Sequence, residues 1–524
     1  MKDTSTSPEI LQNMREKEID VELSLSILEK YNRGDFDHLQ PVAVSEMPDV
    51  DGSTVIDFTG NPAIRLGSGR ARERLANLLP HELIARLEDV ATRRDGGELV
   101  FERDALHELG LLLLPRVAYG VLNGGSATSY ADRTKNQSFS EELFALLEDS
   151  FDRMSEVSRG RAKGLTPGFV QPDGSFGPTF LELKMRNLLV TAKRSRRLLE
   201  TRLPGCSRSL PDPLLPLFQM TSVHTDEQLA EEYDRYRSSP LLSDLIDETG
   251  LDPTRALGAV QPLISAYTHS EEGRPKRVFS HAWERENETL PLPGGHGQSF
   301  AVLADIYRRL ADDGKRFVYL GNVDNLGALP DPVEVAYLAL SGRQAGFDFA
   351  YKTPVDVKGG VLVYDQEGRL NCADIGPAVS KEDVAQAEAA GKPILFNAAT
   401  GLFNLAHLVP NLDRIARELP TRFTDQDKDA GRYSQAEQVT WEVIGMLDDF
   451  LVFSVSKWDR LLAAKLLSET LMTSGIRLED PSYPRSDDPS RDLHSTAARL
   501  HDGLTRKLED EYAMRLEGER WVSA

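Results

Sequence analysis

Short apolar runs alternate with amphipathic stretches through the middle of this chain. Four of the runs have the composition of buried strands, and their sequences are RVAYGVLNGG, RFVYLGNVDN, GGVLVYD and KPILFNAA. Apolar residues at helical spacing lie between them, as over 299–313. This alternation predicts an α/β domain with a mixed, mainly parallel sheet and helices on both faces. Such a sheet binds ligands at the carboxyl ends of its strands.

The two ends of the chain have a different pattern. Residues 1–105 combine charged stretches at helical spacing with a short turn and strand at 49–58, and they hold no pattern typical of chemistry. We expect a helical N-terminal extension there, serving as a cap or a dimerisation surface. Near the other end, a linker rich in Pro, Ser and Asp precedes a strongly charged stretch over 493–516, which predicts a solvated helix that packs on the body or on a partner. The expected domain boundaries are 1–105, 106–472 and 473–524.

Composition excludes several classes of protein. The 524 residues carry a formal net charge of −22, which argues against nucleic acid or an anionic membrane as the main partner, because both require a positive surface. Cys206 and Cys372 lie far apart without C-x-x-C spacing, so neither a disulfide framework nor a structural zinc site is expected. The N-terminus has charges where a signal peptide is apolar, and the longest apolar run, 109–117, is interrupted by Gly, Pro and Arg. We therefore expect a cytoplasmic protein without a membrane segment.

Three positions are candidates for phosphate chemistry. Gly124 and Gly125 follow the first strand, and a glycine pair there lets backbone N–H groups approach a base or phosphates. Lys163 offers a compact cation for phosphate charge. Asp324, at the end of another strand, suits Mg²⁺, which takes few protein carboxylates and completes its coordination with phosphates and water. Each also has an ordinary structural explanation, namely a Gly-Gly turn, a surface Lys-Gly turn and a turn-forming aspartate.

Further polar groups come from four more segments. GGHGQ, at a predicted helix start, presents backbone N–H groups to anions, and its His296 is either a donor to phosphate or ribose or a loop histidine. DVKGG and FNAATGLFNL offer a glycine pair and an asparagine for sugar hydroxyls. RLLAAKLLSETLM offers Lys465, whose ordinary explanation is a snorkelling side chain.

Taken in order, these segments resemble the UDP-glucose pyrophosphorylase family. LNGGSATS is similar to the family's LNGGLGT, TFLEL to TFLDL, FQMTSVHTDE to LMNSFNTDE, GGHGQ to PGHGD, and GNVDNLGA to NIDNLGAT. DVKGG is identical to the family form, FNAATGLFNL resembles FNTNNLWVNL, and RLLAAKLLSE resembles RFLPVKTTSD. The similar segments keep the family's order and run from about 120 to 472. The resemblance implies a Rossmann-like, nucleotide-diphospho-sugar transferase-like fold and a Mg²⁺-dependent nucleotidyltransferase.

The resemblance also implies a role for each candidate. Its reaction joins a nucleoside triphosphate to a sugar 1-phosphate and releases pyrophosphate. The nucleotide would contact Asn123, Gly124, Gly125, Gln261, Gly295 and His296. The sugar would contact Lys358, Gly359, Asp374 and Asn397. Lys163 and Lys465 would be the catalytic residues, acting on the phosphates, and Asp324 would hold the metal.

The chain departs from the family pattern at several positions. An insertion separates the glycine loop from Lys163, so Lys135 is a rival for the phosphate lysine, and Lys163 is preferred because TFLEL follows it. The family's paired asparagines are here Ala399 and Thr400, its EIAQV segment begins at Asp374, and its GHGD aspartate is Gln298. The helical tail leaves no room for the β-helix that the family usually carries at its C-terminus.

Most of these departures fall on residues that read the sugar in the family. A buried group that loses its hydrogen-bond partner costs about 1–3 kcal/mol, so the changes favour another acceptor. We expect a cyclitol 1-phosphate such as valienol 1-phosphate, with GTP or UTP as donor, in bacterial secondary metabolism. The alternatives are an ordinary UTP–glucose-1-phosphate uridylyltransferase, an N-acetylhexosamine-1-phosphate uridylyltransferase and a non-catalytic nucleotide-sugar sensor.

Overall fold

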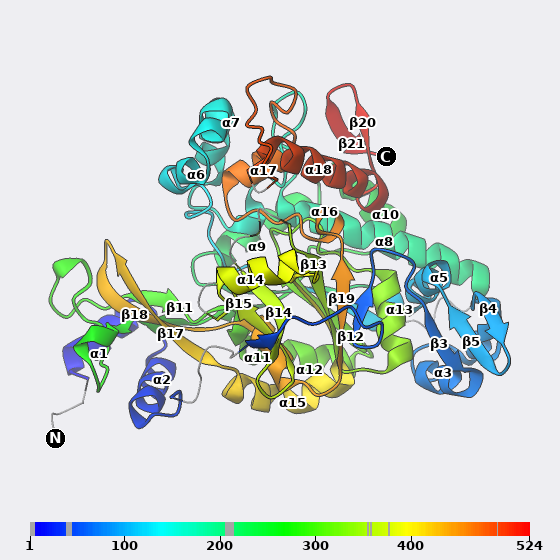
Figure 1. The fold of residues 1–524 in the computed structure, drawn as a ribbon, viewed down its shortest axis with the longest axis horizontal. Helices are drawn as coiled ribbons and strands as arrows, with labels where there is room; N and C mark the ends of the chain where they lie inside the picture. Colours follow the sequence, from blue (N-terminus) through cyan, green and yellow to red (C-terminus); the bar gives the residue numbers. More distant parts are fainter. Residues whose placement is uncertain are drawn as a thin grey trace.

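The computed structural model describes residues 6–37, 44–204, 214–353, 356, 359–375, 378–489 and 491–524. An eleven-stranded sheet forms its centre (Figure 1). Eight strands cross it in the order β2 (Val55–Asp57), β19 (Phe450–Val455), β13 (Ala345–Tyr351), β16 (Leu395–Asn404), β12 (Phe317–Asn322), β6 (Val117–Leu122), β7 (Leu217–Ser222) and β8 (Leu257–Gln261). The other three strands branch off at β16, and they are β14 (Gly360–Asp365), β15 (Leu370–Asp374) and β1 (Val44–Glu46).

Parallel pairing predominates across the eight strands. β12, β6, β7 and β8 are parallel neighbours, and so are β2, β19 and β13. β16 runs antiparallel to both of its neighbours, β13 and β12. The predicted mixed, mainly parallel sheet is therefore confirmed.

Helices cover both faces of the sheet, which is why its strands are continuous apolar runs. β6, β7 and β19 are buried at every position. One face packs against α5 (Arg103–Leu113), α8 (Phe180–Arg202) and α13 (Pro332–Ser341). The other face packs against α11 (Ser299–Val302), α12 (Ala304–Asp312) and α15 (Leu405–Glu418), at the lower edge of Figure 1.

The strands that precede the candidate residues end at the same edge of the sheet. β6 and β12 pair in parallel, with Leu122 opposite Asn322. β7 and β8 are parallel too, with Ser222 opposite Gln261. The segments that begin at Asn123 and Val323 therefore leave the sheet side by side, as the parallel arrangement predicts.

The N-terminal extension contains more strands than the one predicted within residues 1–105. It contains α1 (Pro8–Glu16), α2 (Val21–Arg33), α3 (Ser68–Leu75) and α4 (His81–Ala85). However, β2 joins the central sheet beside β19, and a separate three-stranded sheet is formed by β3 (Ile64–Gly67), β4 (Arg93–Asp95) and β5 (Glu98–Phe101). β2 falls within the strand predicted at 49–58, whereas β3, β4 and β5, which pair with one another, were not predicted.

The C-terminal tail also departs from the helical prediction. α18 (Leu493–Arg506) extends into a π-helical turn and stops before Ala513, whose φ is 46°. The chain then forms a hairpin of β20 (Met514–Glu517) and β21 (Arg520–Ser523). Leu500 and Leu504 of α18 are buried in the main core together with Met514 and Trp521, so the tail packs on the body as expected, and only its last part is a hairpin instead of a helix.

A hairpin arm projects from the sheet at the left of Figure 1. It consists of β10 (Tyr267–Thr268), β17 (Thr421–Lys428) and β18 (Gly431–Gln438), with α1 and α2 packed against it. Tyr31 of α2 lies 4.4 Å from Phe423, ring centroid to ring centroid, and the amide of Asn32 donates to the Lys276 carbonyl (2.9 Å). The first two helices therefore belong structurally to this arm.

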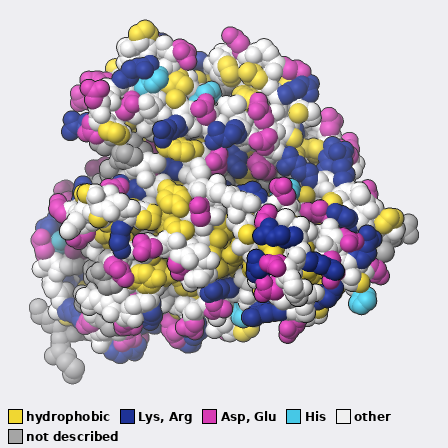
Figure 2. All heavy atoms as spheres, turned by 45° about the vertical axis from the view of Figure 1, so that its right-hand side comes forward, with side chains coloured by type: hydrophobic (Ala, Val, Ile, Leu, Met, Phe, Trp, Pro, Cys, Tyr) yellow, Lys and Arg dark blue, Asp and Glu magenta, His cyan; other side chains and the backbone are white. Residues whose placement is uncertain are grey.

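The insertion before Lys163 is a helical pair. α6 (Arg133–Phe139) and α7 (Glu141–Ser158) pack beside α17 (Leu467–Thr473). The remaining regular elements are α9 (Asp226–Tyr236), α10 (Ser243–Thr249), α14 (Lys381–Ala389), α16 (Lys457–Arg460), β9 (Leu263–Ser265) and β11 (Pro291–Pro293). Among the described residues, no helix has both the length and the apolar character that a bilayer span requires. Lysine, arginine and acidic side chains are interspersed on the face that Figure 2 shows.

Candidate active site

Lys163, Asp324 and Ala464 meet at the edge of the sheet. The ammonium nitrogen of Lys163 lies 3.1 Å from Oδ2 of Asp324 and donates to the carbonyl of Ala464 (2.6 Å). It also lies 4.2 Å from the ring centroid of Tyr130, which adds a cation–π contact. Both charged side chains are only partly exposed, at 11% and 20%. Three distant segments of the chain thus bring a cation, a carboxylate and a polar backbone group together.

The position of Lys163 follows from the glycine loop. Its backbone N–H donates to the carbonyl of Gly125 (2.9 Å), and the N–H of Ala127 donates to the carbonyl of Arg161 (2.9 Å). The segment that carries the lysine therefore runs alongside the loop that follows β6. The rival, Lys135, is exposed on α6, where its ammonium donates to Oγ of Ser129 (2.6 Å). Of the two lysines, Lys163 is therefore the one that lies beside both the glycine loop and Asp324.

Gln261 joins the glycine loop to the GGHGQ segment. Its Nε2 donates to the carbonyl of Gly295 (2.7 Å) and to Oε1 of Gln298 (2.8 Å). A Cβ on Gly124 would lie 3.2 Å from the carbonyl oxygen of Thr221 and 3.5 Å from Oε1 of Gln261. A glycine at this position allows the loop to lie close to Thr221 and Gln261. The predicted nucleotide loop and Gln261 therefore do come together.

Asn123 and Gly125 differ in what they can reach. Asn123 is fully buried, and its Nδ2 donates to Oε1 of Gln219 (3.1 Å). It therefore holds the loop in place and would act on a nucleotide only through the loop backbone. A Cβ on Gly125 would meet nothing within 4 Å, so the loop is open at that residue.

His296 is held as a neutral ring. Its Nδ1 accepts a hydrogen bond from the N–H of Thr440 (3.1 Å), which leaves Nε2 as the nitrogen that carries the proton. Burial lowers the pKa of His296 to about 4. The preceding Gly295 has a φ of 81°, and a Cβ there would lie 2.4 Å from the carbonyl oxygen of Gln438. The histidine can thus donate a hydrogen bond near pH 7 but brings no positive charge.

A cleft of about 780 Å³ begins at the Asp324 turn. Its lining includes Asn322 and Asn325, on either side of Asp324 in sequence. Five of the predicted site residues also line it, namely His296, Gly359, Asp374, Asn397 and Lys465. The Asn397 side chain is held between Sγ of Cys372 (3.6 Å) and the N–H of Ala399 (2.8 Å). Lys358 lies outside the described residues.

Sequence reasoning missed part of the cleft wall. Arg422 of β17 donates to Oε1 of Glu442 (2.5 Å), and both residues line the cleft with Trp441. The Glu442 side chain is 11% exposed, its Oε2 has no partner among the described residues, and burial raises its pKa. Trp441 and Glu442 lie in a short 3₁₀ helix, Thr440–Met446, and such a pair carries no spacing signal, so only the fold reveals it.

The N-terminal extension contributes to the same cleft. Tyr31 and Phe36 are among the lining residues, together with Phe423 of the hairpin arm. The expectation that this part of the chain serves only as a cap or dimerisation surface is therefore incomplete. An aromatic pair near the end of a short helix looks like ordinary packing in the sequence.

The four departures from the family pattern fall in two places. Asp374 and Ala399 line the cleft, on β15 and β16. Gln298 is buried and pairs with Gln261, while Thr400 is buried and donates to the carbonyl of Ala398 (3.4 Å). Two of the four changes therefore line the cleft. Gln298 lies instead beside Gln261, which is a predicted nucleotide contact.

A single carboxylate such as Asp324 is compatible with the coordination of magnesium. Within the described ranges, no group of three or more His, Cys, Asp or Glu side chains is placed to hold a metal ion. Mg²⁺ needs only one or two protein carboxylates when phosphates and water complete the shell. A carboxylate beside Lys163, between two residues that line the cleft, would suit that kind of site.

Comparison with known protein sequences matches part of the chain. The sequence model of the UTP–glucose-1-phosphate uridylyltransferase family matches residues 276–481. The UTP–glucose-1-phosphate uridylyltransferase of Hordeum vulgare is 25% identical over 312 residues, covering 58% of this chain and 60% of that one. The probable UTP–glucose-1-phosphate uridylyltransferase of Schizosaccharomyces pombe is 30% identical over 280 residues, covering 52% and 47%. The chain thus spans about half to three fifths of the length of these relatives.

Solved structures agree on the fold. The UDP-glucose phosphorylase of Trypanosoma brucei has a TM-score of 0.53 at 17% identity, over 92% of this chain and 80% of that one. The UDP-N-acetylglucosamine pyrophosphorylase of the same organism, in complex with an inhibitor, has a TM-score of 0.54 at 15% identity, over 97% and 88%. The family model and the relatives confirm, at the level of the family, the resemblance that the eight segments indicate. Together with the shared fold, they show that this chain is similar to the UDP-glucose pyrophosphorylase family.

Proposed function

We propose that this protein is a sugar-1-phosphate nucleotidyltransferase. It would transfer a nucleoside monophosphate from a nucleoside triphosphate to a phosphate oxygen of the acceptor and release pyrophosphate. The observation that carries the proposal is the contact between Lys163 and Asp324 at the strand edge, with the Ala464–Lys465 segment beside it. In this contact, a lysine that would bind phosphate lies beside a carboxylate that would bind the metal. Both lie at the mouth of a cleft large enough for both substrates.

The reaction needs alignment and charge compensation rather than a base. The attacking phosphate oxygen is already an anion at neutral pH, and the obstacles are repulsion between phosphates and their orientation. Lys163 would stabilise the α-phosphoryl group and the departing pyrophosphate, and Lys465, exposed at the cleft, would hold the acceptor phosphate. The loop at Gly124 and Gly125 would approach the base, with Gln261 held beside it.

Asp324 would hold Mg²⁺. When bound, the ion supplies positive charge that offsets the charge of the triphosphate. The neutral His296 would add a hydrogen bond to a phosphate or ribose oxygen, since its Nε2 is the protonated nitrogen.

UTP and glucose 1-phosphate are the substrates that the relatives favour, because their names give this activity. A second candidate acceptor is a cyclitol 1-phosphate such as valienol 1-phosphate, used with GTP or UTP in secondary metabolism. The observation that favours it is that Asp374 and Ala399, two departures from the family pattern, line the cleft while Lys163, Lys465 and Asp324 are retained. An N-acetylhexosamine 1-phosphate is the third acceptor to compare.

Pyrophosphate release tests the proposal. Purified protein is incubated with Mg²⁺, each of the four common nucleoside triphosphates and each acceptor, and pyrophosphate is measured. We expect release that depends on both substrates, and formation of triphosphate from the nucleotide sugar and pyrophosphate in the reverse direction. Nucleotide binding by calorimetry without turnover for any pair would contradict the proposal and favour a nucleotide-sugar sensor.

A further inference from the structure

The residue that follows Asp324 has its whole side chain engaged. Asn325 is 1% exposed, and its Nδ2 donates to the carbonyls of Arg460 (3.0 Å) and Ala398 (3.3 Å). Its Oδ1 accepts from the N–H groups of Gly327 (3.0 Å) and Leu462 (3.0 Å). One amide therefore joins the Asp324 turn to β16 and to the segment that precedes Lys465.

The same segment also contacts Lys163. The N–H of Leu326 donates to the carbonyl of Leu462 (3.2 Å), and two residues later the carbonyl of Ala464 accepts from the Lys163 ammonium (2.6 Å). Residues 460–464 thus contact Lys163 and the two residues that follow Asp324. A shift of this segment would change the distance between the two charges.

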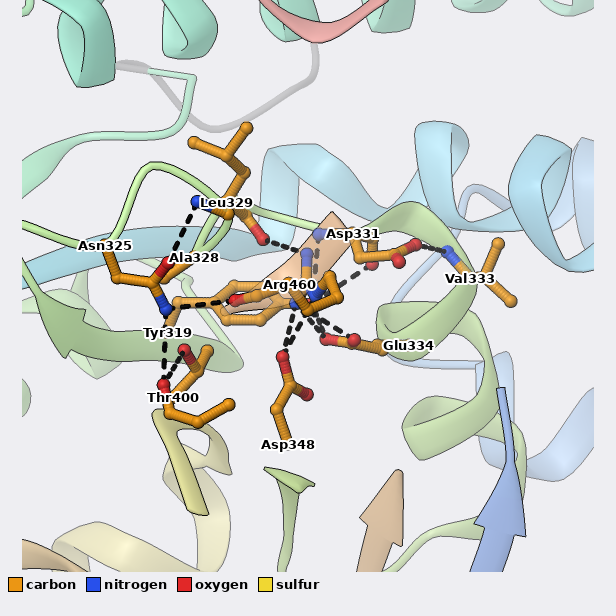
Figure 3. Close-up of polar contacts among 12 residues, drawn as sticks. Tyr319, Asn325, Ala328, Leu329, Asp331, Val333, Glu334, Asp348, Thr400 and Arg460 are labelled. Carbon is orange, nitrogen blue, oxygen red and sulfur yellow. Dashed lines mark hydrogen bonds and ion pairs between the residues drawn. The ribbon is translucent and has the colours of Figure 1, made fainter. Parts of the chain in front are cut away.

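Arg460 prevents such a shift. Its guanidinium donates to Oδ2 of Asp348 (2.7 Å), to Oε1 of Glu334 (3.0 Å) and to the carbonyl of Leu329 (3.1 Å), as Figure 3 shows. All three charged side chains are buried. Moving Arg460 would leave buried charges uncompensated, so the backbone to which Asn325 binds is rigid.

The turn is held from its other side as well. The ammonium of Lys184, on α8, is fully buried and donates to the carbonyls of Asn325 and Ala328. The turn therefore lies between a buried lysine and the Arg460 segment, and the Asn325 amide is the side chain that connects the two parts.

We propose that Asn325 is a positioning residue, which holds Asp324 at its working distance from Lys163 and Lys465 by tying the turn to residues 460–462. The inference rests on the proposed function. An amide suits this role because it alone offers two donors and an acceptor at one side-chain end. A displacement of about 1 Å at a reacting group can cost about 10²-fold in rate.

The test compares Asn325→Ala with a variant of the same network that leaves the turn intact. Tyr319→Phe removes a hydroxyl that donates to Oε2 of Glu334 (2.9 Å), on the far side of Arg460. We expect both variants to lower Tm. Only Asn325→Ala should lower kcat, by about 10²-fold with KM little changed. If the alanine variant does not fold, Asn325→Ser, which keeps a short hydroxyl, takes its place with the same expectation.

Hydrogen exchange tests, without any substrate, whether Asn325 holds the turn against residues 460–462. In Asn325→Ala, amides over 323–328 and 460–466 should exchange faster than in the wild type, and in Tyr319→Phe they should not. Unchanged exchange, or a kcat that falls equally in both variants at equal loss of Tm, would overturn the inference. A wild-type protein without turnover contradicts the proposed function instead, and exchange then decides the inference alone.

Discussion

The ammonium of Lys163 and the carboxylate of Asp324 lie 3.1 Å apart, although helices α8 to α12 and strands β7, β8 and β12 of the central sheet separate them in sequence. The pair is partly exposed, so its contribution to stability is small, at about 0–1 kcal/mol. Its importance is positional. Each charge keeps the other at the rim of the cleft until phosphates and a metal ion arrive, and the two groups then serve different partners.

Removal of the lysine tests the first half of this relationship. Lys163→Ala should lower kcat by about 10²–10³-fold, since the lost charge would act mainly on the transition state. Lys135→Ala is the matched control, because that lysine is exposed and contacts only Ser129 by its ammonium among the described residues. Steady-state kinetics of pyrophosphate release check both variants. The opposite ranking would assign the phosphate role to Lys135.

Removal of the carboxylate tests the second half. Asp324→Ala should abolish turnover at ordinary Mg²⁺ concentrations and leave Tm nearly unchanged, because the side chain is partly exposed and its pairing contributes little to folding. Turnover is measured over a Mg²⁺ titration, with Asp324→Asn as the conservative variant. Near-normal activity in a folded alanine variant would move the metal site elsewhere.

The arrangement of β6 and β12 was accessible from sequence because local patterns specify it. A buried run followed by Gly124, and another followed by Asp324, predict two parallel strands whose ends share an edge, and the register confirms this. The contact of Lys163 with Asp324 needs one further fact, namely that the inserted helices return the chain to the glycine loop. That return depends on packing between α7 and α17, which no local pattern encodes.

Other parts of the site arise only from tertiary contacts. Glu442, in the 3₁₀ helix after β18, and Tyr31 of α2 line the cleft only in the folded chain, and neither has a spacing that marks it. Asn325 belongs to a recognisable turn, but three of its four hydrogen bonds depend on where residues 398 and 460–462 lie. The strands β3, β4, β5, β20 and β21 were missed for the same reason, since pairing and packing stabilise them without a local pattern.

Gly295 should be intolerant of substitution. Its φ is 81°, a conformation that other residues avoid, and a Cβ would lie 2.4 Å from the Gln438 carbonyl oxygen. Backbone strain of this kind costs about 1–3 kcal/mol before the steric overlap is counted. Gly295→Ala should therefore lower Tm clearly, whereas Gly125→Ala, which adds a Cβ into open space, should not. Equal Tm values for the two variants in thermal unfolding would contradict the observed backbone.

Glu442 should make stability depend on pH. Burial raises its pKa in the folded protein, so the folded state binds this proton more tightly than the unfolded state. The resulting stabilisation is present below the pKa of the unfolded state, about 4.3, and is lost as the pH rises through the pKa of the folded state. The Tm of the wild type should therefore fall relative to that of Glu442→Gln as pH increases. Glu142→Gln, at an exposed position, is the control, and parallel wild-type and Glu442→Gln curves would refute the assignment.

The acceptor preference depends on whether Asp374 and Ala399 read the acceptor ring. Ala399 has a φ of 51°, a conformation that asparagine tolerates better than most residues, so Ala399→Asn can restore the family's residue without new strain. Combined with Asp374→Glu, it should raise kcat/KM for glucose 1-phosphate relative to valienol 1-phosphate. One hydrogen bond is worth about 0.5–1.5 kcal/mol, or roughly 2- to 10-fold in this ratio.

Thr400→Asn is the matched control, because Thr400 is buried away from the cleft lining. If the ratio is unchanged in the double variant, or changes equally in the control, the two positions do not select the acceptor. A wild-type kcat/KM for glucose 1-phosphate with UTP of about 10⁴ M⁻¹s⁻¹ or more, above that for valienol 1-phosphate with GTP, would then favour the ordinary uridylyltransferase.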